Sequence, residues 1–418
     1  MPESPKLPSK GDSGMSTSLL YHGFGIRDCE HRQSCYANGI ITFCVQIKPR
    51  FIKCPNCKTY KVIRRGTIKR YIRTISIGSK SVWILVPMQR VYCEYCDIVR
   101  QVNLDFAEPQ KSYSKAFEQY VLELSKYMTI KDISTHLSVS WDIVKDIQKK
   151  HLKKKYKRPK LKNLKKIAID EISIGKGHKY LTIVLNLHNG RVVFVGEGKG
   201  AQALEPFWKR LKASKAHIEA VAIDMSQAYI SAVKKHLPHS TLVFDHFHVV
   251  KYFNDKLSDL RRKVQRNVEH DSQQKALKGS MWLLLKNPQN LDDQRDEPER
   301  LERALQLNKP LYKAYYMKED LRQIWNQKNK FEATIYILDW IIRAYTSGVS
   351  MLKNFAKTLN KHFNGILAYY DFPISTGPLE GTNNKIKTMK RQAYGFRDKE
   401  FFKLKIMALH KKRYALVG

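Results

Sequence analysis

The sequence predicts a multidomain α/β protein, in which two small modules precede an α/β core that an all-helical segment interrupts. Two C-x-x-C pairs lie near the N-terminus, and a short run of amphipathic helices follows them. Apolar strands that alternate with helices begin at residue 167. A chain of 418 residues also exceeds what one hydrophobic core usually organises, so several domains are expected.

The charge of the chain indicates a polyanionic partner. Lysine and arginine number 76 against 38 aspartates and glutamates, which gives a formal net charge of +38. Such a surplus repels itself unless a polyanion neutralises it, so nucleic acid is the expected partner. An anionic membrane surface is the alternative. However, no apolar run is long enough to span a bilayer, and the basic residues do not gather in one amphipathic helix.

The N-terminal segment, residues 1–15, is predicted to be a disordered extension because it is polar and rich in Pro, Ser and Gly. It has no apolar stretch of the kind that directs secretion. Seven cysteines, an odd number of which four form close pairs, favour metal binding in a reducing compartment over disulfides. We therefore expect a cytoplasmic protein.

Four cysteines in the first module, residues 16–108, form a predicted zinc site. They are arranged as two C-x-x-C pairs, namely Cys54, Cys57, Cys93 and Cys96. Four thiolates suit a tetrahedral Zn²⁺, and a two-residue spacer lets one tight turn present both sulfurs to the metal. A redox function is the alternative for a single C-x-x-C pair, and the presence of two matched pairs disfavours it.

The segment between the two pairs is predicted to consist of strands, at residues 61–63, 70–77 and 82–86. We therefore expect a zinc ribbon with an enlarged hairpin, in which the metal has a structural role. The remaining cysteines lack such spacing and are expected to be ordinary thiols, namely Cys29, Cys35 and Cys44.

The second module, residues 110–155, is predicted to be a helix-turn-helix. Apolar residues recur at helical spacing in three successive segments. Ser140 is a suitable N-cap for the third helix, and the short turn before it fits helix-turn-helix geometry. Three exposed residues of that helix are then expected to face the major groove of DNA, namely Trp141, Asp142 and Lys145. A three-helix packing unit without DNA contact remains the alternative.

A basic run from Lys149 to Lys166 overlaps and follows the third helix. Such a run is usually a solvated linker, and we expect residues 156–166 to be one. It also suits the phosphate backbone of DNA. The residues predicted to bind DNA therefore include three of its lysines, namely Lys149, Lys150 and Lys153.

From residue 167 the pattern changes to that of an α/β sheet. Three strands joined by hairpin signals precede two strand–helix units, which is the order of a ribonuclease-H-like sheet. The strands are expected at residues 167–169, 180–187, 191–195, 221–223 and 241–244. Residues 251–370 are basic, show helical periodicity and have no strand pattern. We interpret them as an all-α insertion between the first part of the core, residues 167–250, and the last part, residues 371–418.

Two aspartates are expected at one edge of this sheet. Asp170 and Asp224 each follow an apolar strand, and the carboxyl edge of an α/β sheet is where ligands bind. Two carboxylates that converge there can share a hard divalent cation. For each aspartate alone, a turn residue at a strand end is the alternative. Glu171 and Asp245 remain alternative ligands.

A third acid is expected near residue 380. Gly377 and Pro378 favour the start of a helix, which puts Glu380 in its first turn. A helix-capping acid is the alternative for Glu380. Three auxiliary residues follow at helical spacing on the same face, namely Asn384, Lys387 and Arg391.

Three such carboxylates can hold two Mg²⁺ or Mn²⁺ ions, which activate water or a 3′-hydroxyl and stabilise the leaving oxygen. In this arrangement Asp170 bridges both ions, Asp224 holds one and Glu380 the other, so no lysine or histidine base is required. His248 is a further candidate for contact with the scissile phosphate or the metal shell, and a structural role is its alternative.

At these residues the sequence resembles the ISL-three family of bacterial insertion-sequence transposases. The resemblance covers nearly everything after residue 15 and rests on the two C-x-x-C pairs and on several short motifs. These motifs are Leu20–Gly25, Ala168–Glu171, Asp224–Ser226 with Tyr229, Phe244–His248, Gly377–Lys387 with Lys390 and Arg391, and Tyr394–Phe396.

The resemblance implies a DDE-type catalytic triad that maps onto Asp170, Asp224 and Glu380, with no departure at these positions. It also implies cleavage at the element's ends, transfer of the 3′ ends to target DNA, and recognition of terminal inverted repeats by the N-terminal modules. A homodimer is expected because two ends of the element must be handled together. The protein is expected in the bacterial cytoplasm, associated with the nucleoid. The alternatives are a sequence-specific DNA-binding regulator, a hydrolytic nuclease of the same fold and a catalytically inactive relative.

Overall fold

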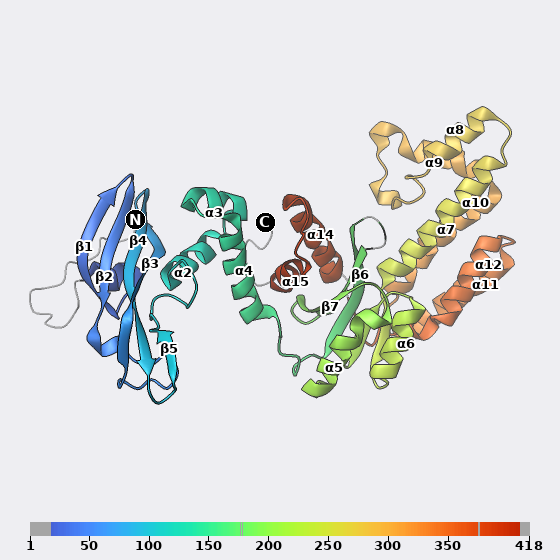
Figure 1. The fold of residues 1–418 in the computed structure, drawn as a ribbon. Coiled ribbons are helices and arrows are strands. Elements are labelled where there is room, and N and C mark those ends of the chain that lie inside the picture. The colour runs from blue at the N-terminus through green and yellow to red at the C-terminus, as the bar shows by residue number, and fades with distance from the viewer. Residues whose placement is uncertain (1–17, 176, 178, 375–376, 410–418) are drawn as a thin grey trace, which may run out of the picture. The chain divides into compact units, whose positions relative to one another are not determined.

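The computed structural model describes residues 18–175, 177, 179–374 and 377–409, and the predicted disordered extension, residues 1–15, lies outside them (Figure 1). The chain divides into two units, of which the first ends at Lys154 and the second begins at Lys155. No helix in the described ranges has the length and apolar character needed to cross a membrane.

The first unit contains a five-stranded sheet in the order β1-β2-β4-β3, with β5 also paired to β4. Its strands are β1 (Cys29–Ala37), β2 (Ile40–Ile47), β3 (Ile63–Ile77), β4 (Lys80–Cys93) and β5 (Ile98–Gln101). Two short helices accompany the sheet, namely α1 (Leu19–Phe24) and the 3₁₀ helix η1 (Pro49–Phe51). Fully buried residues of β3 and β4, such as Ile72 and Ile84, form the centre of its core.

This sheet is larger than predicted, because β1, β2 and β5 lie outside the segment between the two C-x-x-C pairs. β3 is one continuous strand, whereas separate strands are predicted at residues 61–63 and 70–77. Its outer half is almost wholly exposed and polar, so the sequence there lacks an apolar strand pattern. β1 is not predicted for the same reason, because Cys29 is its only fully buried residue.

Three helices follow the sheet, namely α2 (Lys115–Leu124), α3 (Ile130–Leu137) and α4 (Trp141–Tyr156). Side-chain caps define their starts. Thr129 and Asp132 form a reciprocal capping box at α3, and the Ser140 hydroxyl accepts a hydrogen bond from Ile143 N (3.3 Å) at α4. The predicted N-cap role of Ser140 is therefore confirmed. Ser138 adopts a left-handed conformation (φ 51°), which ends α3 and turns the chain sharply into α4.

Arg73 connects the sheet to these helices inside the first unit. Its buried guanidinium donates to the carbonyl oxygens of Val82 in β4 (3.0 Å) and of Leu137 at the end of α3 (3.4 Å). The guanidinium also lies over the ring of Phe117 in α2 (5.7 Å). A buried charge needs such partners, so Arg73 fixes the sheet and the helices to each other.

The second unit is built on a five-stranded sheet in the order β10-β9-β6-β7-β8. Its strands are β6 (Lys166–Gly175), β7 (Lys179–Asn186), β8 (Arg191–Glu197), β9 (Ala220–Ile223) and β10 (Thr241–Phe244). β6, β7 and β8 pair antiparallel, whereas β9 and β10 run parallel to β6. Three antiparallel strands and two strand–helix units therefore occur in the predicted order.

The prediction that the first strand ends at Asp170 is wrong, because β6 continues to Gly175. Its parallel partner β9 pairs only with Lys166, Ile167 and Ala168, but its antiparallel partner β7 accompanies β6 to the end. Asp170 therefore lies inside β6, at the point where β6 extends beyond the end of β9.

Helices cover both faces of this sheet (Figure 1). Side chains of α5 (Glu205–Ser214) and α6 (Gln227–His236) pack with Ile167 and Ile169 on one face. Side chains of α14 (Gly377–Gln392) and α15 (Lys399–Ala408) pack with Ala168 and Ile172 on the other. Because side chains alternate along a strand, Asp170 points to the α14 face and Glu171 to the α6 face.

The helical insertion begins directly after β10. Residues 246–374, all of which the structure describes, contain helices and no strand, as predicted. Its α-helices are α7 (His246–Arg266), α8 (Asp271–Gly279), α9 (Glu297–Gln306), α10 (Lys309–Gln323), α11 (Lys330–Thr346), α12 (Ser350–Lys361) and α13 (Phe363–Leu367). The 3₁₀ helices of this unit are η2 (Ala201–Leu204), η3 (Pro288–Asn290), η4 (Asp293–Arg295) and η5 (Ile324–Asn326).

The insertion returns to the sheet through a close contact between Gly365 in α13 and Phe244 in β10. A Cβ atom at Gly365 would lie 2.3 Å from Phe244 Cε2, so only glycine fits there without rearrangement. The ring of His362 meets the same phenylalanine edge to face at 5.0 Å. Phe244 is thus the point where the start and the end of the insertion meet.

We predict that Gly365→Ala lowers the free energy of unfolding by about 1–3 kcal/mol, because the new methyl group overpacks against Phe244. Thermal unfolding followed by circular dichroism measures this effect. Gly279→Ala is the matched control, since a Cβ atom there meets only Arg300 Nη2 at an ordinary 3.7 Å. Equal stability of the two variants would contradict the assigned contact.

Candidate functional site

The register of the second sheet aligns three aspartates. β6 pairs with β9 so that Lys166 opposes Ala220, and the same offset places Asp170 beside Asp224. β10 pairs with β9 so that Thr241 opposes Ala220, which places Asp245 beside Asp224. Asp224 and Asp245 directly follow the last paired residues of β9 and β10, so the backbones of the three aspartates lie at the same edge of the sheet.

Asp170 is held by two hydrogen bonds from different elements. Its Oδ1 accepts from the backbone N–H of Glu171 (2.7 Å), and its Oδ2 accepts from Asn383 Nδ2 in α14 (2.6 Å). Asn383 Oδ1 is buried and has no hydrogen-bond partner among the described residues. This amide fixes the carboxylate and leaves a hard oxygen donor unused beside it.

Burial raises the pKa of both Asp170 and Asp224. The neighbouring His248 counteracts this increase at both carboxyl groups, and the charge of Asp224 adds to it at Asp170. Burial disfavours the charged form of a carboxyl group, and a bound cation stabilises that form. Carboxylate oxygens are also ligands that suit Mg²⁺. The residues present at this edge therefore fit a divalent metal.

Asp245 and His248 form the start of α7. Asp245 is buried, and its Oδ1 caps the helix by accepting from Phe247 N (3.0 Å). His248 lies one turn further, with Nε2 3.6 Å from Asp245 Oδ2. The structure thus places the predicted auxiliary histidine beside the acids, and it gives Asp245 a capping role.

Glu171 lies on the opposite face, in a separate hydrogen-bond network. Its Oε1 accepts from the hydroxyl of Tyr229 in α6 (2.6 Å) and from Gly200 N (3.1 Å). Thr182 also lies within hydrogen-bonding distance of the Tyr229 hydroxyl (3.1 Å). Glu171 therefore connects β6 to α6 and to the loop after β8.

Glu380 lies in the first turn of α14, as predicted, and its side chain is exposed. Asn383 is one turn further along, so the Glu380 end of the helix lies near Asp170. In the described part of the chain, only the cysteine cluster brings three or more possible ligand residues within 4.8 Å of one another. The three acids are not gathered that closely.

The three predicted auxiliary residues of α14, Asn384, Lys387 and Arg391, are exposed. The sequence prediction did not single out Asn383, although it lies three residues after Glu380. It also gave Tyr229 no role, because its partner Glu171 is distant in the sequence. Spacing alone does not distinguish the third residue after Glu380 from the fourth.

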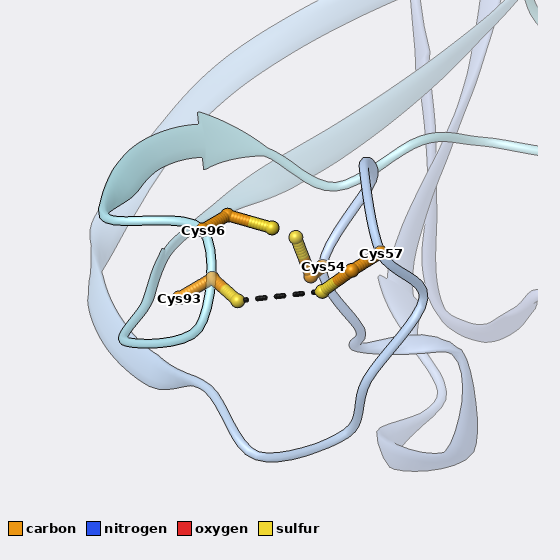
Figure 2. A group of neighbouring side chains, drawn as sticks. All are labelled: Cys54, Cys57, Cys93 and Cys96. Atoms are coloured by element: carbon orange, nitrogen blue, oxygen red, sulfur yellow. Dashed lines mark hydrogen bonds between the residues drawn. The ribbon is translucent and has the colours of Figure 1, made fainter.

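The four cysteines of the predicted zinc site come together between β3, β4 and β5 (Figure 2). All four Sγ atoms lie within 4.8 Å of one another, and those of Cys57 and Cys93 are 3.5 Å apart. Two ligands of a tetrahedral zinc with 2.3 Å bonds are about 3.8 Å apart, so the cluster fits Zn²⁺. The residue after each C-x-x-C pair is left-handed, namely Lys58 and Asp97, so both pairs end in the same kind of turn.

The predicted DNA-binding residues lie along α4 and have different surroundings. Trp141 is 46% exposed, and Lys145 Nζ lies 5.3 Å from the centre of its ring. Lys150 forms ion pairs with Glu108 (2.7 Å) and Glu118 (3.1 Å). Asp142 and Lys153 are exposed, and Lys149 is partly buried.

The predicted linker, residues 156–166, is partly packed. Its charged residues are mostly exposed, but Leu161 and Leu164 are buried in the core of the second unit.

Family profiles match three consecutive parts of the chain. A profile for a zinc finger of the IS204/IS1001/IS1096/IS1165 transposases matches residues 50–96. A profile for the helix-turn-helix domain of transposase family ISL3 matches residues 102–152. A third, for the DDE transposase domain of ISL3, matches residues 167–406. The chain belongs to the ISL3 family of transposases.

Curated relatives of the transposase agree with this assignment. The transposase for insertion sequence element IS1001 of Bordetella parapertussis is 31% identical over 373 residues, which cover 88% of this chain and 91% of that one. The transposase for IS1557 of Mycobacterium tuberculosis is 26% identical over 400 residues, which cover 89% of each chain. The predicted order of zinc ribbon, helix-turn-helix and transposase domain is confirmed, and these domains imply that the protein binds DNA.

A solved structure, the Drosophila P element transposase strand transfer complex, matches with a TM-score of 0.33 and 11% identity. The match covers 62% of this chain and 79% of that one. A TM-score this low supports no conclusion about a shared fold.

We predict that Cys54→Ser or Cys93→Ser removes zinc and weakens specific DNA binding, because the ends of β3 and β4 lose their common ligand. Metal analysis of the purified protein and DNA-binding titrations measure the two effects. Cys35→Ser, at an exposed cysteine, is the control and should change neither. Unchanged zinc content in Cys54→Ser would rule out the assigned metal site.

We also predict that Asn383→Ala slows DNA cleavage by about 10–100-fold and raises the Mg²⁺ concentration needed for half-maximal rate. The substitution leaves Oδ2 of the half-buried Asp170 without the hydrogen bond from Asn383. Gln392→Ala removes an exposed amide from the last residue of the same helix and should leave both quantities unchanged. Equal Mg²⁺ dependence of the two variants would show that Asn383 does not position Asp170.

Proposed function

We propose that the transposase cleaves DNA at the ends of its element and transfers the 3′ ends to target DNA, with Asp170, Asp224 and Glu380 as the catalytic triad. The observation that carries this proposal is the position of Asp170 and Asp224 at the same edge of the sheet, beside helix α14, which carries Glu380 in its first turn. The strand order and the helices on both faces support a ribonuclease-H-like core with an all-α insertion.

The acids have distinct roles in this proposal. Two Mg²⁺ or Mn²⁺ ions held by the triad would activate the attacking hydroxyl and stabilise the leaving oxygen. Asp170, which Asn383 fixes, would help to hold both ions, while Asp224 would hold one and Glu380 the other. His248 in the first turn of α7 faces the scissile phosphate. Asn384, Lys387 and Arg391 are exposed on α14 and bind the DNA backbone that approaches Glu380.

The first unit supplies end recognition. We propose that the helix-turn-helix reads the terminal inverted repeats through Trp141 and Lys145, while neighbouring lysines such as Lys149 and Lys153 contact phosphates. The ion pairs of Lys150 suggest that it holds α4 against neighbouring segments. The active form is a homodimer that holds two ends, with structural Zn²⁺ in each ribbon, and it acts at the bacterial nucleoid.

A strand-transfer assay tests the proposed function. Labelled DNA that carries the ends flanking the protein's own gene is incubated with a target plasmid and Mg²⁺. We expect joined products with the wild type and a loss of at least about 100-fold with Asp170→Asn, Asp224→Asn or Glu380→Gln, with end binding retained. Asp293→Asn, at an exposed acid in the insertion, is the matched control.

Other outcomes select the alternatives. Cleavage without joining indicates a hydrolytic nuclease of the same fold. Binding without any chemistry, with either Mg²⁺ or Mn²⁺, indicates a DNA-binding regulator or an inactive relative. Loss of end binding in the triad variants shows that the acids have a structural role.

A further inference from the structure

Two neighbouring cavities lie along α7 and α12 and share lining residues, and the first of them includes Asp224 of the proposed active site. The first, of about 450 Å³, contains Asp224 and His248 at one end and reaches Tyr252 and Thr358. The second, of about 630 Å³, shares Tyr252 and Thr358 with the first and continues to Lys263. We call the combined depression the α7–α12 groove.

The groove follows one face of α7. Residues that line it recur every three or four positions, from His248 through Tyr252 to Lys263. At 1.5 Å per residue, this face is about 22 Å long. One strand of duplex DNA advances 3.4 Å along the helix axis per nucleotide, so this face matches the axial rise of about six nucleotides.

The groove is positively charged beyond the catalytic acids. Four lysines line it, namely Lys251, Lys256, Lys263 and Lys361. The acids beyond Asp224 are Asp255 and Asp259, and Asp259 is paired with Arg262. Burial lowers the pKa of His362, so this residue remains neutral. The surplus of lysines favours an anionic occupant that extends away from Asp224.

The exposed aromatic ring of the groove, that of Tyr252, already contacts other side chains. The ring of Tyr252 stacks on Phe355 (5.8 Å between centres), and Lys256 Nζ lies 5.2 Å from the same ring. Base stacking requires a free aromatic face, and these contacts compete for it. The flexible lysines beside the Tyr252 ring are suited to bind the phosphates of a DNA backbone. These phosphates are the same whatever the base sequence.

We propose that the α7–α12 groove binds the phosphodiester backbone of the DNA strand that flanks the cleavage point, without regard to its sequence. This inference rests on the proposed function, because it takes the acids at the mouth of the groove as the cleavage site. The insertion then adds affinity for DNA beyond the element's end, while the first unit recognises the end itself.

The test compares two double variants of equal charge. Lys251→Gln with Lys361→Gln removes the two groove lysines nearest to Asp224 and His248. Lys353→Gln with Lys357→Gln removes two exposed lysines of α12 that line neither cavity. Each protein is titrated with end DNA that stops at the cleavage point and with end DNA that continues for six nucleotides of flank.

We expect the flank to increase the affinity of the wild type and of the α12 control, and not that of the groove variant. The slope of log K against log salt for flanked DNA should fall by about 1.4–1.8 in the groove variant alone, as expected for two lost phosphate contacts. Binding to DNA without a flank should be unchanged. Replacing the flank by an unrelated sequence should leave each affinity the same.

Equal loss in the two double variants, or no loss in either, would overturn the proposal, as would a strong dependence on flank sequence. Binding titrations of Asp170→Asn distinguish a failure of the groove proposal from a failure of the proposed function. If that variant keeps flank-dependent binding while wild type joins no ends, the groove stands and the triad assignment fails. If wild type joins ends but the flank adds no affinity, the groove assignment fails alone.

Discussion

The hydrogen bond from Asn383 to Asp170 joins parts of the second unit that the whole helical insertion separates. For this bond to form, the chain must leave the sheet after β10 and return beside it before α14. Asp245 fixes the departure by capping α7, and Gly365 fixes the return by packing directly on Phe244. The position of α14 beside Asp170 therefore depends on the folded insertion, since a shift of α13 would also displace α14.

The first unit also joins segments that lie far apart in the sequence, but it does so with other interactions. Its long hairpin is exposed over much of its length, so its core is small and two other devices hold it together. The cysteine cluster joins the ends of β3 and β4, and the buried Arg73 ties the middle of the hairpin to the helices. Arg73 thus connects the sheet to α2 and α3, while α4 is attached through its buried residues Val144 and Ile147 and through the hydrogen bond from Gln148 to Ser125.

Much of this organisation follows from the sequence, because cysteine spacing and apolar strands are local signals. The cysteine cluster, the helix-turn-helix, the strand order and the helical insertion are all predicted. The extent of β6 is not, because the polar pair Asp170–Glu171 resembles a turn when the pairing with β7 is unknown. The choice of Asn383 over Asn384 depends on the rotation of α14 against β6, which packing determines and spacing does not.

Helix α7 runs without interruption from the cap at Asp245 to Arg266. His248 and the three groove lysines of α7, Lys251, Lys256 and Lys263, therefore share one helical phase. A single residue inserted after His248 would turn every later side chain by about 100° and move the lysines out of the groove. An insertion of seven residues, about two whole turns, would instead return these lysines to the groove side of the helix. The number of residues between His248 and these lysines is therefore part of the geometry of the groove.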